Sequence, residues 1–169
     1  MPDQKTIERA REDAREGKSP STQAGEFVRE EMEHIREGKH GARSTKQAIA
    51  IGLSKARRAG VDLGPPKSSA SSPQVRKKAE QDLEKGRAKT KSSPSRTRSQ
   101  AISKALKREG HSAASKKSLG QQANTAAKAR GASARHASAM KAVRTKGSSG
   151  LKRAAKKAAR TRARERRAA

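Results

Sequence analysis

The scarcity of large apolar side chains is the feature that most restricts how this chain can fold. Leu, Ile, Val and Phe together account for only 16 of the 169 residues. A soluble domain usually devotes more than a fifth of its residues to these types, and chains below that level that carry a high net charge tend towards disorder. A single hydrophobic core that extends through the whole chain is therefore excluded.

Charged and apolar residues are distributed unequally along the chain. Residues 1–63 contain 13 basic and 11 acidic residues, whereas residues 64–169 contain 30 basic and 5 acidic residues. Nine of the 16 large apolar residues lie in the first and shorter segment. This asymmetry predicts a small folded head over residues 1–63 and a Lys/Arg/Ala-rich basic arm over residues 73–169. The intervening Pro/Ser linker, residues 64–72, contains Pro65 and Pro66, which prevent a helix from crossing it.

About three helices are expected in the head, which places it in the all-α class. Apolar or small residues recur there at helical spacing, and each run is followed by a glycine that suits the end of a helix. The expected helices run from about Lys5 to Glu16, from the Ser19–Thr22 segment to Glu37, and from Ser44 to Gly60. Gly52 either allows a close helix approach or marks a weak point in the third helix. A head of this size is marginally stable alone, so a homodimer or a protein partner could stabilise it.

The arm consists of short segments that resemble helix starts and stops. Serine and proline open two of them, at residues 72–73 and 93–94, and glycines close them. Each segment holds at most two or three large apolar residues, too few to offset the entropy that ordering costs. The expectation is a largely disordered or nascent-helical arm. In its final stretch, from Leu151 onwards, charge is expected to line most faces of any helix that forms.

The excess of basic residues in the arm indicates a nucleic-acid partner. Neutralising the phosphates of duplex DNA releases condensed counterions, which gives binding without sequence preference. Proteins that bind RNA or single strands usually stack bases on aromatic rings, and this chain has one Phe and no Trp or Tyr. Double-stranded DNA is therefore favoured over RNA, and the expected function is that of a nucleoid-associated, histone-like protein.

The residues expected to contact phosphates are the clustered cations of the arm. They are Arg76, Lys77, Lys78, Arg96, Arg98, Lys104, Lys107, Arg108, Lys152, Arg153, Lys156, Lys157, Arg160, Arg162 and Arg164.

Two other functions remain open at the level of sequence. The same charge would suit an RNA-associated or ribosome-associated basic protein. Alternatively, the head could be a protein-interaction module whose basic arm only localises it. A membrane partner is not expected, because binding to a bilayer surface needs bulky apolar residues on one helix face and the arm offers mostly alanine.

No catalytic, cofactor-binding or metal-binding site is expected, and the chain is not expected to be an enzyme. The sequence contains no P-loop, no dinucleotide-binding glycine motif, no His-Glu-x-x-His motif and no cysteine. Glu33, His34, Glu37 and His40 are close enough in sequence to be considered as metal ligands. The favoured interpretation is a solvated last turn of the second helix, where protonated imidazoles suit the helix dipole.

Two stretches of the head, residues 23–31 (QAGEFVREE) and 37–53 (EGKHGARSTKQAIAIGL), resemble a family of small basic bacterial proteins. That family carries a domain of unknown function with a Glu-Gly-Lys stretch followed by a Lys-Gln-Ala-Ile-Ala-Ile helix. The resemblance covers residues 19–66. It implies a bacterial cytoplasmic protein, in this case expected at the nucleoid, but no activity and no functional residues. The Lys/Ala-rich arm is also similar in composition to the tails of linker histones and bacterial histone-like proteins.

Overall fold

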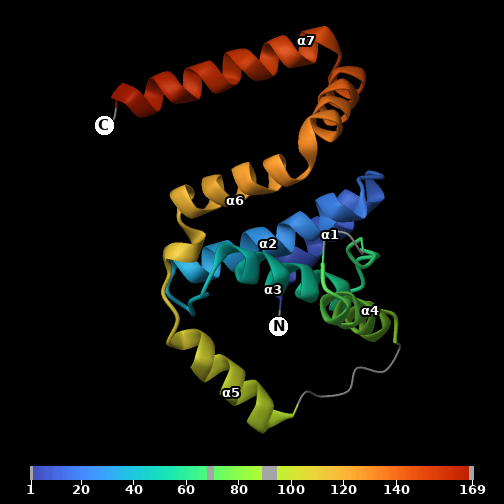
Figure 1. Ribbon diagram of the computed structural model, residues 1–169, viewed down its shortest axis with the longest axis vertical. Helices are drawn as coiled ribbons and strands as arrows, with labels where there is room; N and C mark the ends of the chain where they lie inside the picture. Colours follow the sequence, from blue (N-terminus) through green and yellow to red (C-terminus); the bar gives the residue numbers. More distant parts are fainter. Residues whose placement is uncertain (1, 68–70, 89–94, 168–169) are drawn as a thin grey trace. The chain divides into compact units, whose positions relative to one another are not determined.

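A computed structural model describes residues 2–67, 71–88 and 95–167 of the chain. The described residues form seven α-helices and one short 3-10 helix, with no strand among them, so the all-α class is confirmed (Figure 1). The elements are α1 (Gln4–Arg15), α2 (Pro20–Arg36), α3 (Thr45–Arg58), α4 (Pro73–Arg87), α5 (Arg96–Lys107), η2 (Ser112–Ala114), α6 (Lys116–Ala129) and α7 (Gly131–Arg167).

The chain divides into two compact units, residues 1–122 and residues 123–169. The first unit holds α1 to α5, η2 and the beginning of α6. It therefore continues past the linker expected at residues 64–72, of which residues 68–70 lie outside the described part of the chain. The second unit holds the end of α6 and the whole of α7.

The core of the first unit is built mainly from small side chains around α2, which packs against both α1 and α3. Phe27 and Ile35 are the large apolar residues that are completely buried in the described chain. One apolar cluster consists of Ala10, Ala24, Phe27, Ala56 and Val61. A second consists of Met32, Ile35, Ala42, Ala48, Ala113 and Ala114. Because alanine adds little bulk, the helix backbones can approach closely, and this partly compensates for the lack of large side chains.

Gly52 lies at the closest point between α2 and α3. A Cβ atom added at this residue would lie 2.7 Å from the Cα atom of Val28, with no room unless the backbone moved. Of the two interpretations that the sequence allows for Gly52, the structure therefore supports a close helix approach. The helix ends follow the local signals as well. Gly17, Gly38 and Gly60 have positive φ angles, and the hydroxyl of Ser44 accepts a hydrogen bond from the amide of Gln47 at the start of α3.

Helix α4 packs on α3 through a buried carboxylate. Asp82 is almost fully buried and accepts hydrogen bonds from Ser54 Oγ at 2.6 Å and from Arg58 Nε at 2.8 Å. Burial alone would raise the pKa of Asp82, but the hydrogen bonds from Ser54 and Arg58 outweigh it, and the pKa is lowered. Gly86 meets the carbonyl group of Arg57 so closely that no side chain would fit between them.

The segment after α5 packs against the second half of the head. The amides of Gly41 and Ala42 donate to the carbonyl oxygens of Leu106 and Gly110 at 2.9 and 3.1 Å. The hydroxyl of Thr45 donates to Ala113 O at 2.7 Å within the buried second cluster. Residues some 65 positions apart in the sequence are thus joined by backbone hydrogen bonds.

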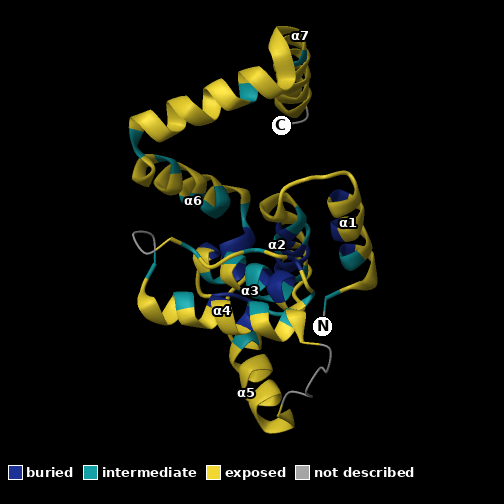
Figure 2. Cartoon of the chain, turned by 90° about the vertical axis from the view of Figure 1, so that its right-hand side faces the viewer, coloured by how far each residue is buried: buried dark blue, intermediate teal, exposed yellow. Residues whose placement is uncertain are grey.

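The expectation of a largely disordered arm is wrong, because helices extend through the whole described chain, including its C-terminal part. For α4 and η2 the reason is tertiary, since alanines and Asp82 become buried where the sequence offers few large apolar residues. For α7 the reason is local. No residue of α7 is buried (Figure 2), and its many Ala, Lys and Arg residues have high intrinsic helix propensity. None of the described helices combines the length and apolar character that a bilayer crossing requires.

Candidate nucleic-acid interface and buried charged cluster

The fifteen basic residues expected to contact phosphates lie on three helices and directly after one of them. Arg76, Lys77 and Lys78 are on α4. Arg96, Arg98, Lys104 and Lys107 are on α5, and Arg108 follows it. Lys152, Arg153, Lys156, Lys157, Arg160, Arg162 and Arg164 are on α7. All are solvent-exposed except Arg76, which is half-buried, so the set remains accessible to a large polyanion.

Helix α7 changes direction at Gly147, whose φ of 64° and ψ of 173° are not helical. Such a backbone conformation is almost confined to glycine. The helix therefore consists of two straight parts, residues 131–146 and 148–167, and most of the cations lie on the second part.

The second part of α7 carries its cations mainly on one side. At 3.6 residues per turn, seven of them fall within about 140° of the helix circumference. We call this set the basic face of α7: Lys152, Arg153, Lys156, Lys157, Arg160, Arg164 and Arg167. Arg162 and Arg166 lie outside it, on the side that also carries Leu151 and Ala155. The expectation that charge would line most faces of this stretch therefore needs refinement, and plotting its residues at helical spacing would have revealed the segregation.

Acidic residues do not offset the basic face. Glu165 is the only acidic residue in α7, and its position in the helical repeat lies outside the basic face. Within the described residues, the ion pairs of the chain lie in the head and on α4, and none involves a cation of α7. The charge of the basic face is thus not neutralised by ion pairs within the described part of the chain.

The only Phe of the chain does not offer a surface for base stacking. Phe27 is 1% exposed in the core of the head, and the sequence contains no Trp or Tyr. Base stacking on aromatic rings, which many single-strand binders use, is therefore not available to Phe27.

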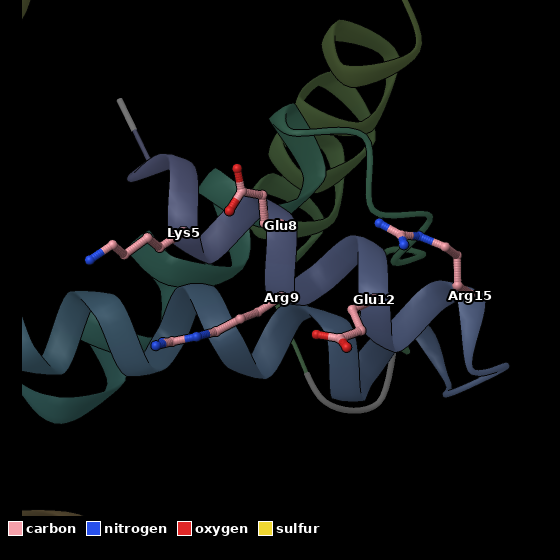
Figure 3. A pocket seen from close by; sticks show the side chains of 5 residues that line it. All are labelled: Lys5, Glu8, Arg9, Glu12 and Arg15. Atoms are coloured by element: carbon pink, nitrogen blue, oxygen red, sulfur yellow. The ribbon is translucent and has the colours of Figure 1, made fainter.

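A shallow hollow follows the outer side of α1 (Figure 3). Its lining consists of charged side chains from this single helix: Lys5, Glu8, Arg9, Glu12 and Arg15. These side chains are exposed and point in different directions without converging on one point. Enclosed sites for small molecules are instead largely apolar with a few converging polar groups, so the hollow does not have the character of an active site.

A cluster of charged residues lies within the head, between α2 and α3. Glu30 and Glu31 on α2 are 4% and 0% exposed. Lys55 on α3 lies 2.6 Å from Glu31 Oε2 and 3.6 Å from Glu30 Oε1. Its ammonium group therefore pairs with both carboxylates, although neither oxygen of Glu31 receives a hydrogen bond of good geometry from the described residues.

Two histidines complete the buried cluster. His40 Nε2 lies 3.3 Å from Glu31 Oε1, and His34 Nδ1 lies 4.0 Å from Glu30 Oε1. The residues that the sequence placed beside them, Glu33 and Glu37, are exposed instead. Residues 27, 30, 31 and 34 share one face of a helix, so the position of Glu30 and Glu31 beside Phe27 could have been predicted from their spacing.

Residues 15–68 match the model of DUF6496, which is described as a family of unknown function. The matched region begins at the last residue of α1 and contains all of α2 and α3, including the buried cluster. This confirms the domain of unknown function that the sequence stretches of the head resemble, and it assigns no activity. Neither the curated proteins nor the solved structures include a match to this chain.

Proposed function

We propose that the chain binds double-stranded DNA without sequence preference, chiefly through the basic face of α7. The observation that carries this proposal is the segregation of seven Lys and Arg residues on one side of an exposed helix, with the single acidic residue of that helix elsewhere. Cations on α5, such as Lys104 and Lys107, and on α4 add further phosphate contacts.

The dimensions of the helix suit a duplex. The basic face extends over residues 152–167, which at 1.5 Å per residue is roughly 22 Å of helix. Duplex DNA presents one phosphate charge per ~1.7 Å of its axis, so several cations can be neutralised together. A helix with its side chains is about 10–12 Å wide, close to the ~12 Å width of the major groove of B-form DNA.

The same dimensions favour DNA over double-stranded RNA. The major groove of A-form RNA is deep and too narrow for a helix to enter. Sequence-specific RNA recognition relies largely on stacking, and Phe27 is buried. A protein with this charge distribution would act at the bacterial nucleoid as a histone-like factor that covers or compacts DNA.

A mobility-shift titration at several salt concentrations tests the proposal with two matched double variants. The first variant, Arg160→Ala with Arg164→Ala, removes two arginines from the basic face. The second variant, Arg162→Ala with Arg166→Ala, removes two arginines at the same spacing from the other side of the same helix. Both variants lose the same charge and gain the same alanines.

The first variant should bind duplex DNA more weakly, and the slope of log K against log salt should become shallower by about 1.8, or 0.9 for each lost phosphate contact. The second variant should lose distinctly less. Equal losses would show that α7 acts as a diffuse cationic chain without a preferred face, and would contradict the proposed interface. Tighter binding to folded RNA than to duplex DNA at the same salt would favour the RNA-associated alternative.

A further inference from the structure

Side chains that commonly bind metal ions converge where α2 ends and the following loop turns back. Glu31 and His34 are on α2, and His40 is on the loop that leads to α3. One ligand atom from each of these three residues lies within 4.8 Å of the others. Glu31 is 0% exposed, and the side chains of His34 and His40 are 13% and 18% exposed. This arrangement belongs to the first unit, whereas the DNA-binding residues proposed for α7 belong to the second.

The ring of His40 is oriented by contacts of both its nitrogen atoms. Its Nδ1 lies 3.1 Å from the carbonyl oxygen of Gly41, and because a carbonyl can only accept, Nδ1 must carry the hydrogen. In the neutral ring, Nε2 then holds a lone pair, and it faces Glu31 Oε1 at 3.3 Å. Two electron-rich atoms at this distance repel each other unless a proton or a metal ion lies between them. A backbone carbonyl that holds the other nitrogen is also the usual way in which a metal-binding histidine is oriented.

The charge of the surroundings favours the binding of a cation. Glu30 and Glu31 bring two negative charges into the buried cluster, and Lys55 supplies one positive charge. Asp3 adds a further carboxylate, with Oδ2 lying 3.5 Å from His34 Nε2. Asp3 is 60% exposed and keeps its hydration, but isolated buried carboxylates are costly unless they are paired or bound to a metal, so a metal ion beside His34 and His40 would stabilise Glu30 and Glu31.

We infer that Glu31, His34 and His40 form a binding site for a divalent transition-metal ion, and that zinc is the metal that these ligands suit best. Two imidazoles and one carboxylate are a frequent ligand set for zinc, whereas calcium and magnesium prefer oxygen ligands alone. With metal–ligand bonds of about 2.0–2.1 Å, the ligand atoms of a tetrahedral zinc ion lie roughly 3.3 Å apart. The separation of His40 Nε2 from Glu31 Oε1 already has this value.

The neighbouring charged residues orient this site. Lys55 holds Glu31 by its other oxygen, Oε2, which leaves Oε1 turned towards His40. Glu30 accepts a hydrogen bond from the backbone amide of Asp3 at 3.2 Å, and this contact brings the N-terminal residues to the cluster. The bound ion would therefore join α2 to the loop before α3, next to the first residues of the chain.

The test measures zinc binding to the full chain by calorimetry, together with the unfolding temperature with and without zinc. The wild-type protein should bind one equivalent of zinc and unfold at a higher temperature in its presence. In His34→Ala and in His40→Ala the dissociation constant should rise by more than about tenfold. His136→Ala removes an exposed histidine of α7 and is the matched control, with an affinity equal to that of the wild type.

Absence of zinc binding by the wild-type protein would overturn the proposal, and so would equal zinc affinity in all three histidine variants. If a variant at His34 or His40 does not fold, the wild-type protein still decides the question. Paramagnetic Co²⁺ should then shift the NMR signals of residues around His34 and His40 and leave those around His136 unchanged. Cobalt effects centred on other residues would count against the site. DNA binding is measured separately, so this inference and the proposed function can fail independently.

Discussion

Asp82 is the buried charged residue that links α4 to α3. Its carboxylate is buried and accepts hydrogen bonds from Ser54 and Arg58, two residues of α3. A second aspartate, Asp62, pairs with Arg87 at 2.6 Å, but both of these side chains are largely exposed. Buried hydrogen bonds to a charged group contribute more to stability than exposed ion pairs do. The two aspartates therefore form a natural comparison.

Replacing Asp82 by Asn should lower the free energy of unfolding by about 1–3 kcal/mol at neutral pH, because the amide removes the charge that Arg58 and Ser54 stabilise. Asp62→Asn makes the same chemical change at an exposed site and should cost less than about 1 kcal/mol. Urea unfolding followed by circular dichroism measures both values. Similar losses in the two variants would contradict the assigned role of Asp82.

The contribution of Asp82 to the free energy of unfolding should also depend on pH, and its direction follows from the pKa shift. Because its pKa is lowered in the folded protein, the carboxylate binds a proton less readily there than in the unfolded chain. The stabilisation is therefore fully present above the unfolded pKa of about 3.9 and disappears as the pH falls through the folded pKa. The stability difference between the wild type and Asp82→Asn should be constant near neutral pH and shrink below about pH 4. A difference that grew on acidification would have the wrong sign.

Gly52 should not tolerate even one additional methyl group. Gly52→Ala would place a Cβ atom 2.7 Å from Val28 Cα, so α2 and α3 would have to separate, at an expected cost of about 1–3 kcal/mol. Gly25 on α2 is a matched control, because a Cβ there meets nothing within 4 Å. Gly25→Ala should stabilise the protein by up to about 1 kcal/mol through helix propensity. Thermal unfolding of the two variants should therefore shift in opposite directions, and a stabilised Gly52→Ala would contradict the close approach.

At the scale of the helices, local signals in the sequence predict the head well. The expected helices, over about 5–16, from within 19–22 to 37, and over 44–60, correspond to α1, α2 and α3 within a few residues. Their ends are determined by glycines with positive φ and by the cap at Ser44, features that act over one helical turn. Such features can be read from neighbouring residues without knowledge of the tertiary structure.

Contacts between distant residues are what the sequence did not predict. A count of large apolar residues does not predict that α4 and η2 pack against the head. Asp82 holds α4, and the buried Ala113 and Ala114 hold η2. Helical spacing places Glu30 and Glu31 on the same face as Phe27, but it does not predict their pairing with Lys55, which reaches them only once α3 packs on α2. Burial of an ionised residue depends on its partner, and the partner is brought to it by the fold.

The bend in α7 provides a prediction at the same scale. Gly147→Ala should convert residues 131–167 into one straight helix, because an L-residue disfavours the conformation at Gly147 and no buried contact of α7 resists straightening. The chain has no cysteine, so spin labels can be placed by Ala137→Cys and Ala158→Cys alone. In the straightened helix the labelled backbones should lie about 32 Å apart, farther than with Gly147 present.

A matched control separates a change in the direction of α7 from the general gain in helix propensity when Ala replaces Gly. Gly120→Ala lies within α6, where the backbone is already helical and a Cβ meets nothing within 4 Å. It should raise helicity slightly and leave the distance between the labels on α7 unchanged. An unchanged distance in Gly147→Ala as well would show that something other than the glycine produces the bend.

At the scale of the whole molecule, the stabilising contacts lie in the first unit, whereas α7 carries positive charge that almost no acidic residue offsets. Both apolar clusters and the buried ion pairs lie within residues 1–122. Residues 131–169 hold 13 of the 43 basic residues, one acidic residue and no buried side chain among those described. A protein organised in this way should tolerate changes in its cationic helix without a loss of fold.

Truncation after Arg130 should therefore separate stability from DNA binding. The shortened chain keeps α1 to α6 complete. It ends directly before Gly131, whose positive φ marks the turn between α6 and α7, so no helix is cut. Its unfolding temperature should stay within about 2 °C of the full-length value, because α7 buries no residue. Its affinity for duplex DNA should fall steeply, and the salt dependence should become shallower, because the basic face is gone.

Calorimetry and mobility shifts on the same two proteins measure both effects. A large loss of thermal stability would show that α7 supports the fold, and unchanged DNA affinity would move the interface to α4 and α5.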